Sequence, residues 1–363
     1  MRLAFLSSSS GWGGLERNLL RYATWMKDAG HDVEISAVPG SPLAEAVVES
    51  DLPLRLIQRQ RRYAPIRAGR RLKHHLIAHR FEALWIRDPR DLPLAALATR
   101  NTHCDLIFQQ GMQIPHRKRA PWHQNRYAAV DHWISPLECL RREALANTPL
   151  VSDQTKVISL ALENHWFTKV KNQEQARKVF NVPANAKLVG LFGRIDKLKG
   201  HADLLRALAE TKAADWHALI IGENTRNTVN GDELQALKKL TTELGIQDRI
   251  HWHPPTEELS LAYDCCDAYA MCSASETFGM VTIEAMARRV PVIGTNSGGT
   301  PELLGYGSRG KLYSSGDFKE LARSLADPAP WPMPTLEQLE QFSRMKAVQQ
   351  WQDLLVHSRR SAL

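Results

Sequence analysis

SASETFGMVTIEAMARRVPVIGTNSGGTPELL, residues 273–304, is the most informative stretch of this sequence. Its pattern predicts a loop, a helix, the short buried strand 290–293 and a glycine-rich turn. Glu276 falls in the loop and Glu284 about a turn and a half inside the helix, so both carboxylates can face one side. Between them, Gly279 allows a ligand close to the backbone, and free N–H groups at a helix start attract phosphate. Two carboxylates that flank an anion site suit a nucleotide sugar.

The same stretch resembles the donor-binding signature of retaining glycosyltransferases of family 4, which have the two-domain architecture called GT-B. The resemblance rests on the paired glutamates, the Phe-Gly at 278–279 and the Pro-Val-Ile strand at 291–293, which occur together. It implies that Glu276 contacts hydroxyls of the transferred sugar and that Glu284 contacts the ribose. It also implies that the diphosphate binds around Phe278, Gly279, Met280 and Val281. The alternative is a solvated helix with surface glutamates.

A second segment supports this interpretation. Residues 187–192 predict a buried strand, and Gly193-Arg194 and Lys199-Gly200 follow it. Such a loop lies at the carboxyl end of a parallel sheet, where ligands bind in open α/β folds. Arg194 can grip two phosphate oxygens and Lys199 adds a point charge. The resemblance gives Glu276, Arg194 and Lys199 the catalytic roles, with the two cations neutralising the diphosphate leaving group. Solvated loop charges are the alternative.

The N-terminus carries another glycine loop. Leu3 to Leu6 predict a buried strand, and residues 11–17 open a helix that reaches about Gly30. A dinucleotide fingerprint is one interpretation, because Glu34 lies about twenty residues further on, although in mid-strand. In the resembled family a Gly-Gly pair at this point, here Gly13 and Gly14, closes over the donor phosphates and the acceptor.

Composition favours a large enzyme of the cytoplasm. The chain has 363 residues and 43% apolar content, enough for two cores. No apolar run approaches the roughly 18 residues that span a bilayer, and residues 3–6 are too short for a signal-peptide core. The five cysteines form no CxxC pair, and the 14 histidines show no zinc spacing. We therefore expect no metal and no cofactor besides the nucleotide-sugar co-substrate.

The net positive charge is confined to the first part of the chain. Residues 1–160 hold 23 Lys and Arg against 15 Asp and Glu, whereas residues 161–363 hold 24 of each. The charge is densest at 55–80 and 116–119, and the first of these stretches includes the apolar residues Ile57, Tyr63, Ile66 and Leu72. This pattern fits an acidic acceptor, such as phosphorylated lipopolysaccharide core or a lipid-linked glycan, or anionic lipid at the inner face of the cytoplasmic membrane. A plain solvated surface is the alternative; nucleic acid is disfavoured, since aromatic stacking motifs are missing.

Strand and helix signals alternate along the chain without internal repeats, which predicts an α/β fold. We expect an N-terminal domain at 1–162 and a nucleotide-sugar-binding domain at 163–342, with the polar stretch 163–174 as linker. A final helix at 336–357 should cross back, so that residues 343–363 join the first domain. The resemblance implies that these are two Rossmann-like parallel-sheet domains facing across a cleft.

In the N-terminal half the resemblance is topological, and the sequence departs from the family pattern. Gln110-Gly111 stands where many members have His-Gly, although His116 and His123 lie close by in sequence. The usual Asn-Gly-Asp turn after the inter-domain strand is also missing. Arg87 and Asp91 follow a predicted strand at 83–86 and can contact acceptor hydroxyls or phosphate. A surface ion-pair cluster is the equal alternative. The acceptor-side candidates are therefore Arg87, Asp91, Gln110, His116 and His123.

Together these features predict a metal-independent retaining glycosyltransferase, with the donor on the C-terminal domain and the acceptor on the basic N-terminal domain. The resemblance implies that the departing phosphate takes the acceptor proton. A nucleotide-sugar epimerase of related fold is one alternative, and a non-catalytic glycan- or nucleotide-binding protein is the other.

Overall fold

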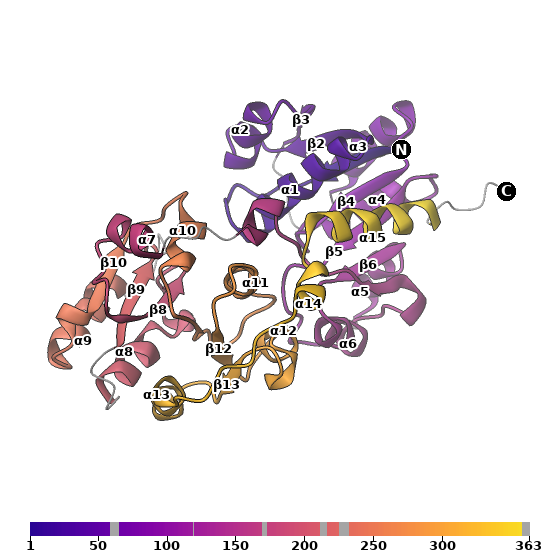
Figure 1. Ribbon diagram of the computed structural model, residues 1–363. Helices are drawn as coiled ribbons and strands as arrows, with labels where there is room; N and C mark the ends of the chain where they lie inside the picture. The colour runs from indigo at the N-terminus through magenta and orange to yellow at the C-terminus, as the bar shows by residue number, and fades with distance from the viewer. Residues whose placement is uncertain (59–64, 119, 169–172, 211–215, 225–231, 358–363) are drawn as a thin grey trace. The chain divides into compact units, whose positions relative to one another are not determined.

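The computed structural model describes residues 1–58, 65–118, 120–168, 173–210, 216–224 and 232–357. The chain divides into two compact units. Unit 1 is Met1–Ser159 together with the segment from Arg344 onward, and unit 2 is Leu160–Ser343. Each unit is built around one parallel sheet flanked by helices (Figure 1). The predicted class, two Rossmann-like α/β domains, is therefore confirmed.

Unit 1 has a seven-stranded parallel sheet in the order β3-β2-β1-β4-β5-β6-β7. Its strands are β1 Arg2–Leu6, β2 Asp32–Ala37, β3 Leu54–Leu56, β4 Ala83–Ile86, β5 Asp105–Gln109, β6 His132–Ser135 and β7 Thr155–Val157. Its helices are α1 Gly14–Asp28, α2 Pro42–Glu49, α3 Ile66–Ala78, α4 Leu92–Thr99, α5 Pro121–Tyr127, α6 Glu138–Asn147 and α15 Arg344–His357. The central strands are fully buried because helices cover both faces, as expected for parallel sheets.

The returning helix α15 is anchored in unit 1 by an aromatic cluster. Trp351 is fully buried, with its ring centroid 3.8 Å from that of Trp85 on β4 and 5.9 Å from that of Tyr22 on α1. Arg344, at the start of the helix, forms an ion pair with Asp28. Buried aromatic rings contribute large apolar areas, so α15 is an integral part of this core.

Unit 2 has a six-stranded parallel sheet in the order β10-β9-β8-β11-β12-β13. Its strands are β8 Lys187–Phe192, β9 Trp216–Ile221, β10 Ile250–His253, β11 Ala268–Met271, β12 Val292–Thr295 and β13 Lys311–Tyr313. Its helices are α7 Gln173–Val179, α8 His201–Glu210, α9 Glu233–Glu243, α10 Leu259–Asp264, α11 Met280–Ala287, α12 Thr300–Leu303, α13 Phe318–Ala326 and α14 Leu336–Glu340.

Each sheet reverses its strand order once, and we call these places switch points. The unit 1 switch point lies between β1 and β4, and the unit 2 switch point lies between β8 and β11. At such a place, the loops that follow the two strands lead to helices on opposite faces of the sheet, and ligands of open α/β folds bind between them. The topology therefore directs attention to four loops: those after β1, β4, β8 and β11.

The predicted final helix at 336–357 is wrong in one respect, because it is broken into α14 and α15. The carbonyl of Phe342 accepts the N–H of Leu162 at 2.8 Å, and Leu162 pairs with Ser343 in a parallel bridge. The Phe342 side chain is buried, with its ring centroid 6.3 Å from that of Phe278. These contacts take the chain out of helical geometry at the point where it passes from unit 2 to unit 1.

The first passage between the units lies at Ser159-Leu160, ahead of the polar stretch 163–174 that we expected to be the linker. Leu160 to Leu162 are buried, and Arg288 donates to the carbonyls of His165 and Trp166. The start of that polar stretch is thus bound to unit 2. Within the described ranges, no helix combines the length and the apolar character needed to cross a membrane.

Candidate functional site

The unit 2 switch point brings together two of the predicted catalytic residues. Lys199 ends the short helical turn after β8, and Glu276 lies in the loop after β11. The Lys199 Nζ atom lies 2.6 Å from Glu276 Oε2, and the two side chains are 28% and 18% exposed. A cation and a carboxylate therefore meet where the two loops face each other, and both remain accessible.

The glycine of the Lys-Gly pair at 199–200 is required for steric reasons. Gly200 has a φ of 69°, and a Cβ at this position would lie 2.0 Å from the backbone oxygen of Cys272. Only glycine permits this approach, which sets the turn bearing Lys199 against the end of β11. The backbone N–H of Ala274 donates to the Leu198 carbonyl at 2.9 Å and holds the two loops together.

The predicted anion site at the start of α11 has the expected backbone geometry. Gly279 precedes the helix with φ 90° and ψ 69°, a left-handed conformation that favours glycine. The first N–H groups of a helix have no partner inside it, and the helix dipole favours an anion there. On the other side of this loop, the N–H of Gly299 donates to the Glu276 carbonyl at 2.8 Å. Phe278 is buried and anchors the loop to the unit core.

Glu284 lies inside α11 and is almost fully buried. Its Oε2 accepts the hydroxyl of Tyr263 at 3.0 Å, and the same hydroxyl lies 3.1 Å from the carbonyl of Val281. Burial and the neighbouring Glu284 carboxylate raise the pKa of Tyr263 well above its usual range, so Tyr263 stays a hydrogen-bond donor. Tyr263 therefore fixes the orientation of the carboxylate assigned to the ribose.

Gly193 and Arg194 follow β8 directly. The N–H of Gly193 donates to the Ile221 carbonyl at 2.9 Å, which fixes the start of the loop. The Arg194 side chain is 66% exposed, and its Nη2 lies 3.9 Å from Asp196 Oδ2. A long and exposed guanidinium beside a switch point is available to a phosphate ligand.

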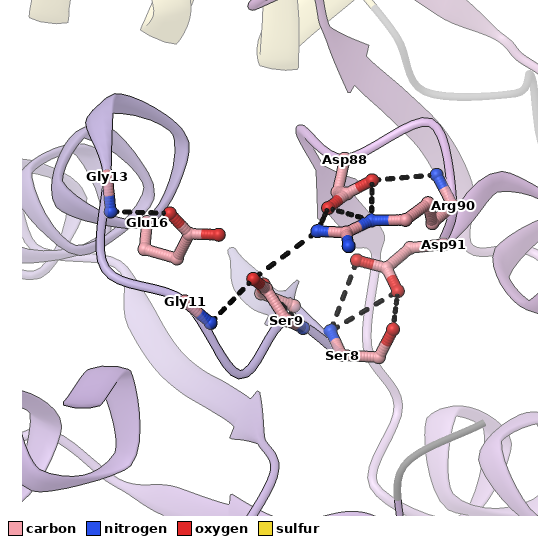
Figure 2. Close-up of polar contacts among 9 residues, drawn as sticks. Ser8, Ser9, Gly11, Gly13, Glu16, Asp88, Arg90 and Asp91 are labelled. Atoms are coloured by element: carbon pink, nitrogen blue, oxygen red, sulfur yellow. Dashed lines mark hydrogen bonds and ion pairs between the residues drawn. The ribbon is translucent and has the colours of Figure 1, made fainter. Parts of the chain in front are cut away.

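The unit 1 switch point is held by a different set of contacts (Figure 2). Asp91, after β4, is buried; its carboxylate accepts the backbone N–H of Ser8 at 3.2 Å as well as the Ser8 hydroxyl. Burial raises the pKa of Asp91 to about 7. Arg90 donates through Nε to Asp88 at 2.8 Å and through Nη2 to Ser9 at 3.4 Å. The loop after β4 thus fixes the loop after β1.

Of the acceptor-side candidates, the structure brings Arg87 and Gln110-Gly111 together. Arg87 is buried after β4, and a Cβ on Gly111, after β5, would lie 3.3 Å from its Nη2. The Gln110 amide is engaged within the protein, because its oxygen accepts Trp133 Nε1 at 3.1 Å and Ser135 Oγ at 2.7 Å. Gln110 therefore shapes the end of the sheet, and the expectation that it meets an acceptor is not supported by these contacts.

The two histidine candidates lie further along the chain after β5. His116 is exposed, whereas His123 on α5 is bonded to Arg126 of the same helix. The Arg-Asp segment also forms contacts within unit 1. Asp88 pairs with Arg90, and Asp91 bonds Ser8. The buried Asp91 carboxylate holds the loop after β1 in place and is not a surface charge.

The dinucleotide interpretation of the N-terminal loop is not supported by the position of Glu34. Its carboxylate lies 2.7 Å from Nε2 of His75 on α3, and β2 continues beyond it to Ala37. Gly13 and Gly14 form the start of α1, where the N–H of Gly13 donates to Glu16 Oε2 at 2.9 Å. Glu16 is therefore the internal anion at this helix terminus.

The two parallel sheets, each with one switch point, define the class of fold as GT-B. Residues 172–328 match the family described as Glycosyl transferases group 1, and residues 13–161 match the Glycosyl transferase 4-like domain. The chain belongs to this family of glycosyltransferases, which confirms the resemblance drawn from the glutamate motif.

Curated relatives and solved structures agree with this assignment. A D-inositol 3-phosphate glycosyltransferase of Corynebacterium jeikeium is 35% identical over 159 residues, which is 42% of this chain and 37% of the relative. The chain thus matches well under half the length of such curated relatives. A glycosyltransferase from Rickettsia africae has a TM-score of 0.84 at 18% identity, over 99% of both chains. HepE from Anabaena, solved in complex with UDP, has a TM-score of 0.81 at 21% identity, over 98% of this chain and 100% of that one.

Two functional contacts were missed from the sequence. Tyr263 precedes Glu284 by most of a βα unit, and no spacing rule links them. The contact between Ser8 and Asp91 had a usable signal, because both follow strands that are neighbours at a switch point.

Proposed function

We propose that this protein is a retaining glycosyltransferase that moves a sugar from a nucleoside-diphosphate sugar to a glycan or lipid-linked acceptor. The observation that carries the proposal is the contact between Lys199 and Glu276. The bond to be broken joins a sugar to a phosphate, so the groups that bind the two halves must be adjacent. Glu276 would accept sugar hydroxyls, and Lys199 would face the phosphate.

The proposed reaction is the one that the family resemblance implies. The bond between the anomeric carbon and the phosphate oxygen breaks, and the acceptor oxygen bonds to that carbon on the same face. The departing phosphate takes the acceptor proton. Negative charge develops on the diphosphate, where Lys199, Arg194 and the N-terminus of α11 oppose it. Glu284, held by Tyr263, would bind the ribose.

The donor and the pathway are finer parts of the proposal. The Anabaena neighbour was solved with UDP and also with UDP-glucose, which makes uridine nucleotides the first to test. The curated relatives are named for an inositol phosphate acceptor, a small anionic molecule. Because the first 160 residues hold all of the net positive charge, we propose an anionic acceptor in the synthesis of lipopolysaccharide, capsule or another bacterial surface polysaccharide.

One assay separates this proposal from its alternatives. The protein is incubated with UDP-, GDP- and ADP-sugars, with and without candidate acceptors, and free nucleoside diphosphate and sugar products are followed by NMR. We expect acceptor-dependent release with the anomeric configuration retained. Glu276→Ala should lose it, while Glu257→Ala, an exposed glutamate of the same unit, should not. Isomerised donor without acceptor indicates an epimerase, and binding without turnover indicates a non-catalytic binding protein.

We further propose that helix α3 contacts anionic lipid. Arg67, Arg70 and Arg71 are exposed on it, and Ile66 and Ile77 are exposed by 53% and 55%. Leu72, expected among the surface apolar residues, is instead buried in the core of unit 1. Four residues of this stretch lie outside the described residues: Arg59, Arg61, Arg62 and Tyr63, as does Arg119 of the second cluster.

Vesicle sedimentation tests the lipid contact. Each cation near an anionic surface adds about 1 kcal/mol, and salt screens it. Binding should therefore rise with the phosphatidylglycerol fraction and fall with salt. The triple change Arg67→Glu, Arg70→Glu, Arg71→Glu should abolish it without changing nucleotide affinity. The matched control reverses Lys178, Lys238 and Lys239, which are exposed in unit 2. Equal binding to neutral vesicles, or none, contradicts the proposal.

A further inference from the structure

Arg87 is a buried cation that forms no ion pair with the described residues. The residue is 2% exposed, and its Nε and Nη1 atoms have no hydrogen-bond partner within the described part of the chain. Burial lowers its pKa to about 10, which still leaves the guanidinium positive at neutral pH. An unpaired charge in this setting costs several kcal/mol, so its presence requires an explanation.

The guanidinium lies beside the first turns of α1. The groups that act on its charge through space are Tyr22, Arg21 and Glu16, all on this helix. Across from it, Gly111 approaches both Arg87 Nη2 and the side chain of Leu15, the second residue of α1. Arg87 Nη2 therefore lies near Leu15 in the first turn of α1, and residues 11–14 at the start of this helix are exposed.

The neighbouring carboxylates are engaged elsewhere. Asp88 pairs with Arg90, Asp91 accepts from Ser8, and Glu16 accepts the N–H of Gly13 (Figure 2). The other nearby cation, Arg21, donates to Asn18 at 3.0 Å. Guanidinium groups bind carboxylate and phosphate through two parallel hydrogen bonds, and helix N-termini favour the same ligands. The described carboxylates thus leave Arg87 without an ion pair, which an anionic ligand could supply.

We propose that Arg87, with the N-terminal turn of α1, holds a phosphate or carboxylate group of the acceptor substrate. This inference rests on the proposed glycosyltransferase function, and it makes Arg87 the residue that selects acidic acceptors over neutral ones. The subsite lies wholly within unit 1, whereas the donor motif lies in unit 2.

The test uses the full-length chain, saturated with whichever of UDP, GDP or ADP binds best, so that the donor site is filled. Inorganic phosphate and glucuronate are then titrated at constant ionic strength, and thermal unfolding and calorimetry report binding. In wild type, at least one of these anions should raise Tm saturably. In Arg87→Met its Kd should rise at least about tenfold, the loss expected for a charged hydrogen bond. Without anion, Arg87→Met should melt no lower than wild type, because it removes an unpaired buried charge.

Two variants keep the test decisive. Arg142→Met removes an exposed arginine of unit 1 and should respond like wild type. Arg87→Lys keeps the charge without the fork and should show intermediate affinity; it also serves if Arg87→Met does not fold. A response to phosphate indicates a phosphorylated acceptor, and a response to glucuronate indicates an acceptor that carries a uronic acid.

Three results would overturn the subsite: no anion response in wild type, an unchanged response in the Arg87 variants, or a response seen only without nucleotide. The last would assign Arg87 to the donor. In each case, retained nucleotide binding leaves the proposed function standing. Failure of all three nucleotides to bind would instead contradict the proposed function itself.

Discussion

The two sheets reverse their strand order in equivalent ways, but their switch points differ in how charge is used. In unit 2, Lys199 and Glu276 come from opposing loops and form a partly exposed pair. In unit 1, Asp91 is buried and holds the loop after β1, while Arg87 is buried and forms no ion pair with the described residues. The charged pair of unit 2 is accessible, whereas the charges of the unit 1 switch point are buried.

The difference shows that fold topology alone does not determine a site. Both units place a glycine-containing loop ahead of a helix at the carboxyl end of a central strand. In unit 2, a cation and a carboxylate from the two loops meet, and we propose that this pair faces the sugar–phosphate bond. In unit 1 the loops are fixed first, by Ser8, Asp91 and Arg90, and this rigidity would hold an acceptor group in place.

The largest expected effect is the pH response of Asp91 in unit 1. Its pKa is raised from 3.8 to about 7 by burial, so folding favours the protonated form. The stability that the protonated Asp91 adds to the folded state is complete below about pH 4 and is lost as pH rises to about 7. At about 1.4 kcal/mol per unit of pKa difference, the loss is on the order of 4 kcal/mol. Asp91→Asn should remove this pH dependence. The urea midpoint of the variant, measured relative to that of wild type, should therefore rise between pH 4.5 and 8. A constant difference across this range would refute the buried-acid account.

In unit 2, His201 should give the opposite slope. Burial lowers its pKa from 6.5 to about 4, so the folded state favours the neutral ring. Its contribution is present above pH 6.5 and is lost as pH falls towards 4, by about 3 kcal/mol. His201→Leu should therefore gain in urea midpoint over wild type as pH is lowered from 7 to 4.5. If the urea midpoints of the Asp91 and His201 variants, relative to wild type, changed with pH in the same direction, this contrast between the units would be wrong.

Glu276 should affect the rate far more than nucleotide affinity, because it is assigned to the transferred sugar. Glu276→Ala should lower the transfer rate by about two orders of magnitude or more, the scale of a transition-state contact. The affinity for nucleoside diphosphate should stay nearly intact. Steady-state kinetics and calorimetry on the same samples measure both. If Glu276→Ala and Glu284→Ala lost nucleotide affinity equally, the two roles would be wrongly assigned.

The smallest effect concerns Tyr263, which orients Glu284. Tyr263→Phe should weaken nucleoside diphosphate binding by about 1 kcal/mol, the net value of one hydrogen bond. Tyr269→Phe is the matched control, since that tyrosine is equally buried but donates to the Phe192 carbonyl. Calorimetry that gave the same affinity for both variants and wild type would leave Tyr263 with a packing role only.

The sequence predicted best those structural features that depend on local residue patterns. The strands at 83–86 and 187–192 have the predicted bounds, because buried parallel strands are continuous apolar runs. The short edge strands β3 and β13 were missed, since three residues carry little periodicity. The break at Phe342 depends on Leu162, far away in sequence, and no local pattern records it.

The candidate site shows the same difference between local patterns, which the sequence reveals, and long-range contacts, which it does not. The Lys-Gly and paired-glutamate motifs placed Lys199 and Glu276 at one switch point. The contact of Glu284 with Tyr263 could not be predicted, because it depends on which elements the fold brings together. For Arg87 the sequence left an acceptor contact and a surface ion pair equally open, and its burial excludes the surface ion pair.

The central claim is that the donor motifs of unit 2 provide most of the nucleotide affinity, and calorimetry tests it most directly. The best ligand among UDP, GDP and ADP is titrated into wild type, Glu284→Ala, Arg194→Ala and Asp91→Asn. The account predicts a loss of about 1.5–3 kcal/mol in each of the two unit 2 variants, for a charged hydrogen bond removed, and wild-type affinity in Asp91→Asn. Unchanged affinity in both unit 2 variants, or an equal loss in Asp91→Asn, would contradict it.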